Sequence, residues 1–288
     1  MLSPPTTGAV DAHVHLWRYA PAELGWISDE MRVLQRDFAA EPVAAELARA
    51  GVVGGVAVQA RQSLAENDHL LAERARCPAI LGVVGWVDLR AADAGAVLER
   101  YAGRLCGVRH VVQDEPDDDF LLRADFQRGV ALLPRFGLTY DLLIVPRQLA
   151  AACAFADRNP ELPLVLDHLG KPFIRDGRIE PWARDLRELA KRPHVWLKAS
   201  GLVTEADHAR WTAADLRAYL DVAFEAFGPE RILFGSDYPV CLLAASYAQV
   251  HGVVTRYVAA LSAPERTRVL GDNARAFYRL PRAEDHAP

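Results

Sequence analysis

Cysteine is scarce in this 288-residue chain, and its four cysteines form no CxxC pair. Cys77, Cys106, Cys153 and Cys241 lie far apart in the sequence, which argues against a cysteine-based zinc site and against a disulfide framework. We expect them to be reduced, as is typical of a cytoplasmic protein. The first ten residues also lack a basic stretch followed by an apolar one, so we expect no signal peptide.

Long hydrophobic runs and an excess of basic charge are lacking too. No apolar stretch approaches the ~20 residues that a membrane-spanning helix needs, so we expect no membrane association. Lys and Arg total 33 against 38 for Asp and Glu, which gives a formal charge of −5. A nucleic-acid partner would need a basic face, so this balance predicts none. With 51% apolar and 25% charged residues, the composition is that of a globular protein and excludes a disordered chain.

What the sequence does contain is a regular alternation of short apolar runs and amphipathic segments. No low-complexity tract or linker divides it, so we expect one domain over residues 1–280 and a C-terminal tail at 281–288. Apolar strands that alternate with helices predict a parallel sheet covered by helices. Eight such units predict an α/β fold of the closed (β/α)8 TIM-barrel type. The predicted strands are residues 10–16, 52–60, 80–89, 105–112, 138–145, 162–169, 195–202 and 232–240.

An open doubly wound sheet is the competing fold. It would place a glycine-rich phosphate-binding turn after an early strand, whereas the glycines at 51–55 come before the strand that they adjoin.

Two helix starts have capping-box sequences, Thr212 with Asp215 and Ser262 with Glu265. The predicted helices are residues 42–50, 65–76, 92–104, 123–136, 146–159, 181–192 and 212–227.

In a barrel, the C-terminal ends of the strands are the informative places, because active sites lie there. The first strand ends in the sequence Asp11-Ala-His13-Val-His15. Strand alternation predicts that these three polar side chains share one face, with the apolar residues between them facing the helices. Two imidazoles two residues apart can converge on one ion or one substrate group, so a functional role is favoured over that of core histidines.

The sixth and eighth strands also end in ionisable residues. Alternation places either Asp167 or His168 inside the barrel without deciding between them, and a simple turn is the alternative. Asp237 stands at the end of an apolar strand, where a buried carboxylate needs a metal, a histidine or a proton. A helix N-cap is the alternative for Asp237. Further strand ends supply Gln59, Arg61, Trp86, Arg109, His110, Asp141, Lys198 and Ser200, which together predict a polar pocket.

Several of these motifs resemble the amidohydrolase superfamily, and within it the amidohydrolase 2 family with its sugar-lactonase branch of L-fuconolactonase-like and L-rhamnonolactonase-like members. The resemblance covers essentially the whole chain and implies a (β/α)8 barrel that hydrolyses a cyclic ester. It also implies that His13, His15, His168 and Asp237 occupy the superfamily's metal-ligand positions. The motifs are His13-Val-His15, Asp167-His168-Leu-Gly-Lys171-Pro, Lys198-Ala-Ser-Gly and Gly235-Ser-Asp237-Tyr-Pro.

The chain departs from the metal-binding members at two strands. Those members place a histidine at the end of strand five and often a lysine or glutamate at strand four. Here the fifth strand offers Tyr140-Asp141 and the fourth offers Arg109-His110. The residue set therefore argues against a binuclear centre. It leaves two alternatives open: one divalent ion, for which zinc is the favoured candidate, or no metal at all.

The expected reaction is hydrolysis of a small-molecule sugar-acid lactone such as L-fuconolactone to the free acid. Asp237 is the predicted base, with His13, His15 and His168 as catalytic residues or as ligands of a zinc ion. Without a metal, His168, Arg109 or Lys198 would stabilise the oxyanion. The predicted substrate-binding residues are Gln59, Glu66, Asn67, Trp86, Arg109, His110, Asp141 and Lys198, with Trp17 as a second stacking face.

Two other functions compete with lactone hydrolysis. One is a decarboxylase (lyase) of the same superfamily, acting on an unsaturated or aromatic carboxylic acid, whose pocket should be drier and more apolar. The other is a binding protein on a barrel that has lost catalysis. A dianionic lactone such as a pyrone dicarboxylate would need at least two arginines at the mouth, and Arg61 and Arg109 leave that open.

Overall fold

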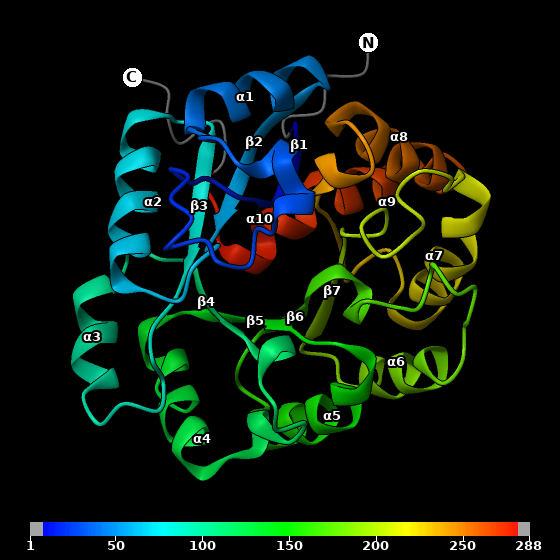
Figure 1. Ribbon diagram of the computed structural model, residues 1–288. Helices are drawn as coiled ribbons and strands as arrows, with labels where there is room; N and C mark the ends of the chain where they lie inside the picture. Colours follow the sequence, from blue (N-terminus) through cyan, green and yellow to red (C-terminus); the bar gives the residue numbers. More distant parts are fainter. Residues whose placement is uncertain (1–7, 282–288) are drawn as a thin grey trace.

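The strands of the computed structural model, which describes residues 8–281, form a ring (Figure 1). Eight parallel strands pair in sequence order, and a parallel bridge between Val14 and Tyr238 joins the first strand to the segment that follows the last. The predicted (β/α)8 barrel is confirmed. The strands are β1 (Ala9–Val14), β2 (Val52–Val58), β3 (Ile80–Gly85), β4 (Gly107–Val111), β5 (Thr139–Leu143), β6 (Leu164–Leu166), β7 (Val195–Ala199) and β8 (Ile232–Phe234).

Every predicted strand overlaps an observed one, but each observed strand ends earlier than predicted. The clearest cases are β6 and β8, with three residues each. Both stop where the first polar residues begin, and the backbone soon afterwards enters the left-handed region at His168 and Asp237. The residues that follow are loops at the C-terminal rim of the barrel, where they can reach a ligand.

Helices surround the strands and cover their outer face (Figure 1). Both predicted capping boxes are present, with the Asp215 carboxylate accepting from the Thr212 backbone N–H at 2.7 Å. The predicted helix 123–136 is interrupted instead, because Pro134 cannot continue it. The helices are α1 (Ala40–Arg49), α2 (Leu64–Arg76), α3 (Ala94–Tyr101), α4 (Ala124–Val130), α5 (Leu149–Arg158), α6 (Trp182–Ala190), α7 (Ala213–Phe227), α8 (Tyr247–Val258), α9 (Ala263–Thr267) and α10 (Asn273–Tyr278).

The inside of the barrel is apolar at one end and polar at the other. Helix α10 packs against the N-terminal end, where its Phe277 and Tyr278 join a buried cluster (Figure 1). Polar side chains occupy the C-terminal end. None of the helices within residues 8–281 has the length and apolar character needed to cross a membrane. The predicted tail lies almost wholly outside the described residues. The strand members of the apolar cluster include Val10, Ala12, Val56, Val58, Val84, Val165 and Leu233.

The expected alternation along β1 is wrong for Asp11. Asp11 pairs with Gly55 and Val14 with Ala57, so β1 has one extra residue between these pairs. This β-bulge puts Ala12 among the interior residues and turns Asp11 out of the barrel interior. There the Asp11 carboxylate accepts hydrogen bonds from the backbone N–H groups of His13 and Ser236. Asp11 is therefore a structural residue that ties β1 to the end of β8.

Helix α4 packs so closely on the chain that one glycine has no room for a side chain. A Cβ at Gly129 would overlap the carbonyl group of Leu89. We expect Gly129→Ala to lower the free energy of unfolding by about 1–3 kcal/mol, the usual cost of overpacking, as measured by urea denaturation. Gly95→Ala in α3 is the matched control, because its Cβ would meet only Leu132 at 3.6 Å. Equal stability of the two variants would contradict this packing.

Candidate active site

Two imidazoles and a carboxylate meet at the C-terminal end of the barrel. The Nε2 atoms of His13 and His15 lie 3.2 Å apart. Asp237 Oδ1 lies 3.3 Å from His15 Nε2 and 3.8 Å from His13 Nε2. His168 Nε2 lies 4.0 Å from the same oxygen. The four side chains, which the sequence predicted as one group, are thus brought together and are nearly excluded from solvent.

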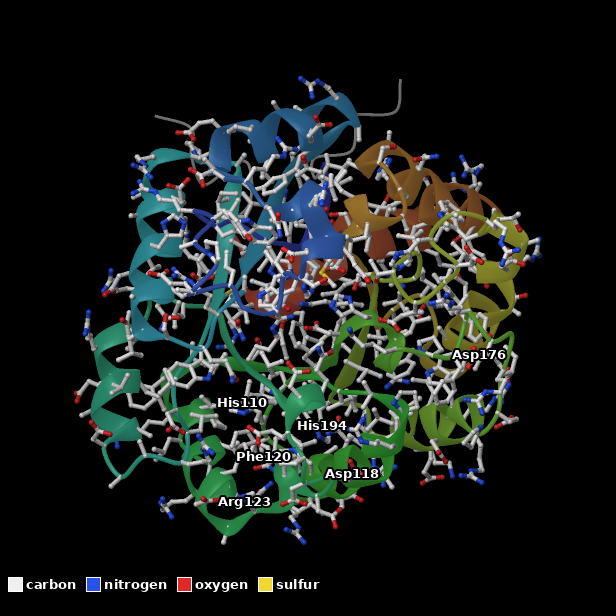
Figure 2. All side chains as sticks on the ribbon, viewed as in Figure 1. His110, Asp118, Phe120, Arg123, Asp176 and His194 are labelled. Atoms are coloured by element: carbon white, nitrogen blue, oxygen red, sulfur yellow. The ribbon has the colours of Figure 1, made fainter. Side chains whose placement is uncertain are left out.

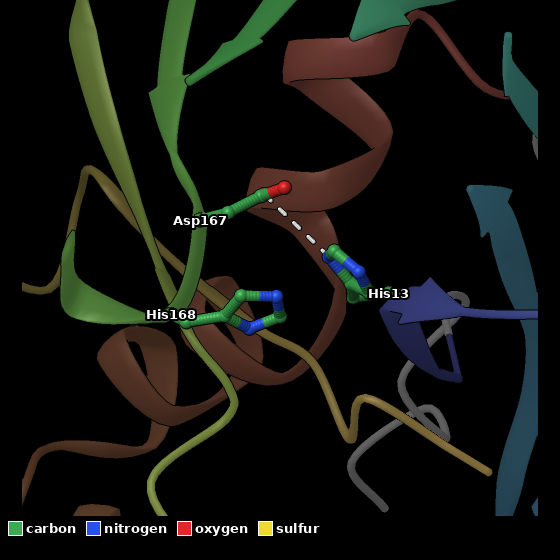
Figure 3. A group of neighbouring side chains, drawn as sticks. All are labelled: His13, Asp167 and His168. Atoms are coloured by element: carbon green, nitrogen blue, oxygen red, sulfur yellow. Dashed lines mark ion pairs between the residues drawn. The ribbon is translucent and has the colours of Figure 1, made fainter. Parts of the chain in front are cut away.

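The turn after β6 directs two neighbouring side chains into the barrel. Alternation along a strand would allow only one of Asp167 and His168 to face inward. His168 adopts a left-handed conformation (φ 54°), so the chain turns and both side chains approach His13 (Figure 3). Asp167 Oδ1 lies 3.5 Å from His13 Nδ1. Asp237 is also left-handed (φ 59°), and such strained residues concentrate at functional sites.

The cluster has the donor set that a divalent ion requires. Zinc–nitrogen bonds of ~2.0 Å in a tetrahedral site place ligand atoms about 3.3 Å apart, close to the 3.2 Å and 3.3 Å separations at His15. His15 Nδ1 lies 2.8 Å from the Val58 carbonyl oxygen and can only donate to it, so in the neutral imidazole the lone pair is on Nε2, which faces the cluster. The chemistry of the residues therefore fits one divalent ion held by His13, His15 and Asp237, with His168 beside them.

Burial keeps two imidazoles neutral, and the imidazoles around Asp237 keep its carboxylate charged. Burial lowers the pKa of His168 to about 4, although the facing Asp237 favours its protonation. Burial and the nearby Lys198 lower the pKa of His13 well below its ordinary value. Burial opposes ionisation of Asp237, but the facing imidazoles, His168 first, outweigh it and hold the carboxyl pKa below its ordinary value. At neutral pH, His13 and His168 offer nitrogen lone pairs and Asp237 is ionised.

A buried network of charges supports the cluster from below. Lys198 Nζ lies 2.6 Å from Asp141 Oδ2, 2.9 Å from Asp167 Oδ1 and 3.2 Å from His13 Nδ1. Burial alone would lower the pKa of Lys198, but the two carboxylates raise it. Tyr278 donates its hydroxyl to Asp141 at 2.7 Å, so the C-terminal helix is connected to the same network. These contacts fix the position of His13 from the side opposite the cavity.

A cavity of about 890 Å³ opens above the cluster. Its lining includes Asp237, His15, His168 and Arg109 from the predicted site. Arg109 Nη1 lies 2.9 Å from Asp167 Oδ2 and 3.3 Å from His13 Nε2, so the guanidinium joins the carboxylate network to the imidazoles. The volume is that of a small-molecule site, and the ionisable groups line it together.

The other predicted binding residues contact protein groups rather than the cavity. The carboxylate of Glu66 accepts from the Ala60 N–H and from Arg61, and Asn67 makes two hydrogen bonds with the Trp86 backbone. Gln59 donates to the Arg109 carbonyl oxygen at 3.3 Å. Their role in substrate binding stays a prediction, and so does that of Asp141 and Lys198 beneath the cluster.

His110 lies on the outer face of its strand. Its ring stacks on Phe120, with centroids 4.7 Å apart, in the region of α4 (Figure 2). Its Nε2 lies 2.7 Å from Glu115, and Trp86 Nε1 lies 3.4 Å from its Nδ1. Trp17, the second predicted stacking face, is fully buried. These rings pack within the protein in the structure, so contact with substrate stays a prediction for each.

One aromatic residue that was not predicted from the sequence lines the cavity. Trp26, in the long connection between β1 and α1, is 39% exposed and faces the cavity. The available signal was its position after the first strand, because loops at that end of a barrel form the mouth. Tyr278 was missed as a contact of Asp141, and no local sequence signal places a C-terminal helix under the barrel.

The chain is similar to known proteins over nearly its full length. The amidohydrolase family model matches residues 10–280. An L-fucono-1,5-lactonase of Burkholderia multivorans is 43% identical, covering 96% of this chain and 97% of that protein. An L-fucono-1,5-lactonase of Burkholderia ambifaria is 35% identical, covering 98% of this chain and 99% of that protein. A crystal structure of a zinc-bound amidohydrolase from Burkholderia multivorans has a TM-score of 0.92 and 42% identity, covering 95% of this chain and 99% of that one.

Proposed function

The chain belongs to the amidohydrolase family, and we propose that it is a hydrolase that opens a sugar-acid lactone of the L-fuconolactone kind to the free acid. The observation that carries the proposal is the convergence of three imidazoles and one ionised carboxylate on the floor of a cavity at the C-terminal end of the barrel. The two L-fucono-1,5-lactonases, similar over nearly their full length, support the same activity.

Asp237 moves the proton in the proposed reaction. Water attacks the acyl carbon, and one of its protons passes to the Asp237 carboxylate. When the bond between the acyl carbon and the ring oxygen breaks, Asp237 returns that proton to the leaving oxygen. The product is a hydroxy acid, which ionises at neutral pH and releases one proton to solution. Each turnover therefore leaves Asp237 ionised and ready for the next water.

The negative charge that develops on the carbonyl oxygen needs donors. Arg109 presents its guanidinium to the cavity beside His13. His168 Nδ1 lies 2.9 Å from the Ser200 hydroxyl, which can donate or accept. His168 can therefore present either an N–H or a lone pair at Nε2. The first would bind the oxyanion, and the second would bind an ion.

Asp237 is a ready base but a weak one, because its pKa is held low. The residues that would hold a divalent ion are His13, His15 and Asp237, with His168 at longer range. We propose zinc as that ion, because imidazole nitrogens suit it. The chemistry that the ion would supply when bound is a lower pKa for the attacking water and polarisation of the ring carbonyl.

The cavity suits a neutral polyol better than a polyanion. A dicarboxylate ligand would need cations that are not already neutralised. The three lysine and arginine residues that line the cavity are all paired with carboxylates. Neutral polar groups such as Gln62, Ser63 and Thr204 line it as well, which fits the hydroxyls of a sugar lactone and not the drier pocket expected of a decarboxylase. The pairs are Arg61 with Glu23 and Glu66, Lys171 with Glu205, and Arg109 with Asp167.

A pH-indicator assay on a panel of aldonolactones tests the proposal. Freshly prepared 1,4- and 1,5-lactones are incubated with the protein, and the spontaneous rate is subtracted. We expect protein-dependent acid release on the lactone whose configuration matches the pocket. A parallel panel of carboxylated aromatic acids is followed for release of carbon dioxide. Decarboxylation without lactone hydrolysis would overturn the proposal in favour of the lyase.

Zinc binding is a separate expected result. Protein loaded with zinc and dialysed should retain about one ion per chain by elemental analysis. With free zinc at 100 times its Kd the protein should also melt at a higher temperature, since such an excess stabilises the folded state by about 2.7 kcal/mol. His15→Ala should lose both effects. His208→Ala, at the rim of the same cavity, is the control and should keep them. Failure of the unmodified protein to retain zinc would contradict the assigned ligands.

A further inference from the structure

The cavity has one wall that is distinctly apolar. Trp26 and Met31 contribute to it from the connection between β1 and α1, and Val240 and Leu243 contribute from the short helix η7 (Val240–Leu243) that follows β8. We call these four residues the apolar wall. Met31 belongs to a second short helix, η1 (Asp29–Leu34), which packs against η7, so the two halves of the wall are continuous.

Within the apolar wall, the Trp26 side chain is fixed by contacts with the protein although part of its surface is exposed. Trp26 donates its indole N–H to the Ala60 carbonyl oxygen at 3.1 Å. Its ring meets Trp17 edge-on, with centroids 5.8 Å apart and an angle of 89° between the planes. Nevertheless, 39% of Trp26 is exposed. An indole that is oriented by its N–H and still offers exposed ring surface to a cavity is ready to contact a ligand's carbon atoms.

The wall lines the same cavity as the reacting groups. Val240 is three residues beyond Asp237, and both line the cavity. Neutral polar side chains line other parts of the cavity, including Gln62, Ser63 and Gln113 from the loops after β2 and β4. A ligand bound between them would have an apolar group near Asp237 and hydroxyl groups on its other side.

We propose that the apolar wall binds the terminal methyl group of a 6-deoxy sugar lactone and selects for it. This inference rests on the proposed lactonase function. In a 1,5-lactone, the methyl is attached to the carbon that bears the ring oxygen, so only that carbon and the leaving oxygen separate it from the acyl carbon. The methyl therefore lies beside the bond that breaks, and Val240, three residues beyond Asp237, lines the same cavity as Asp237. The remaining ring carbons carry hydroxyls, which suit the polar side of the cavity.

Three 1,5-lactones that differ only at this carbon test the inference. L-fucono-1,5-lactone carries the methyl, L-galactono-1,5-lactone has a hydroxymethyl there, and D-arabinono-1,5-lactone has hydrogen. We expect kcat/KM for the methyl compound to exceed that for each of the others by roughly 10-fold or more, the usual value of a methyl-sized group in an apolar pocket. The pH-indicator assay on the full chain gives these ratios.

Variants of nearly unchanged shape connect the preference to the wall. Val240→Thr and Met31→Gln replace apolar with polar surface and should reduce the methyl preference several-fold. Val111→Thr is the matched control, because Val111 lines the same cavity at the end of β4, outside the wall, and it should leave the ratio unchanged. Activity on the arabinono compound shows that each variant is folded and catalytically competent.

The outcomes separate the two claims. Hydrolysis of all three lactones at similar kcat/KM by the unmodified protein would overturn the methyl subsite and leave the lactonase intact. Equal effects of Val240→Thr and Val111→Thr on the ratio would also overturn it, because the preference would then not belong to the wall. Failure of the unmodified protein to hydrolyse any of the three would overturn the proposed function, and this inference with it.

Discussion

Replacing Asp237 by asparagine is expected to lower kcat for lactone hydrolysis by about 10²–10⁴-fold, the range that a positioned general base contributes. Asparagine keeps the shape of the side chain but cannot take a proton from water. The ionised oxygen that it replaces lies 3.3 Å from His15 Nε2 and 4.0 Å from His168 Nε2. Asp167, the neighbouring carboxylate, is paired with Arg109 and Lys198 and is not among the residues that line the cavity. The rate is measured with the pH-indicator assay, and circular dichroism confirms that the variant is folded.

Asp114→Asn is the matched control for this change. Asp114 is an exposed carboxylate at the mouth of the same cavity. Its replacement alters the charge of the cavity by the same amount but removes no group from the cluster, so we expect less than about a 3-fold effect on kcat. A near-normal rate for Asp237→Asn would refute the assigned base. Equal losses in the two variants would show that the net charge of the cavity matters and not the position of Asp237.

Replacing Lys198 by methionine is expected to lower the free energy of unfolding by about 3–5 kcal/mol, the cost of removing one partner from a buried ion pair. Lys198 is fully buried between Asp141 and Asp167, with Nζ–oxygen distances of 2.6 Å and 2.9 Å. Methionine preserves much of the length of the side chain but leaves Asp141 without its cation and Asp167 with Arg109 alone. Urea denaturation followed by tryptophan fluorescence measures the loss.

Lys191→Met is the control, because Lys191 forms an ion pair with Glu188 on the surface and its side chain is 69% exposed. Exposed pairs contribute about 0–1 kcal/mol, so this variant should be nearly as stable as the unmodified protein. The double variant Lys198→Met/Asp141→Asn removes the carboxylate that lost its cation and should recover part of the loss. If Lys198→Met were as stable as Lys191→Met, the buried network would not hold the site as described.

The barrel was predictable because its signal is repeated along the chain. The eight apolar runs each lie on an observed strand, and the capping box at Thr212 begins α7 as predicted. His13, His15, His168 and Asp237 were predictable as a group, because the ends of parallel strands meet at one rim of the barrel. These features depend on periodicity and chain order, which a single sequence records.

The features that could not be predicted from the sequence depend on departures from regular backbone geometry. One extra residue in β1 turns the Asp11 side chain to the opposite face of the strand, and no residue type in that segment predicts a bulge. A left-handed residue at His168 lets two neighbours face the same way, against strand alternation. Trp26 reaches the cavity from a long connection whose path depends on its packing against the rest of the protein. The residues most relevant to specificity are thus the least visible in the sequence.

The most direct test of the account is hydrolysis of L-fucono-1,5-lactone in water enriched in oxygen-18, with the product analysed by mass spectrometry. We predict protein-dependent formation of the hydroxy acid at a rate far above the spontaneous one. One oxygen-18 atom should be in its carboxylate and none in the released ring hydroxyl, and Asp237→Asn should abolish the protein-dependent part. Formation of the acid at the spontaneous rate only, or oxygen-18 in the ring hydroxyl, would contradict water attack on the acyl carbon at this site.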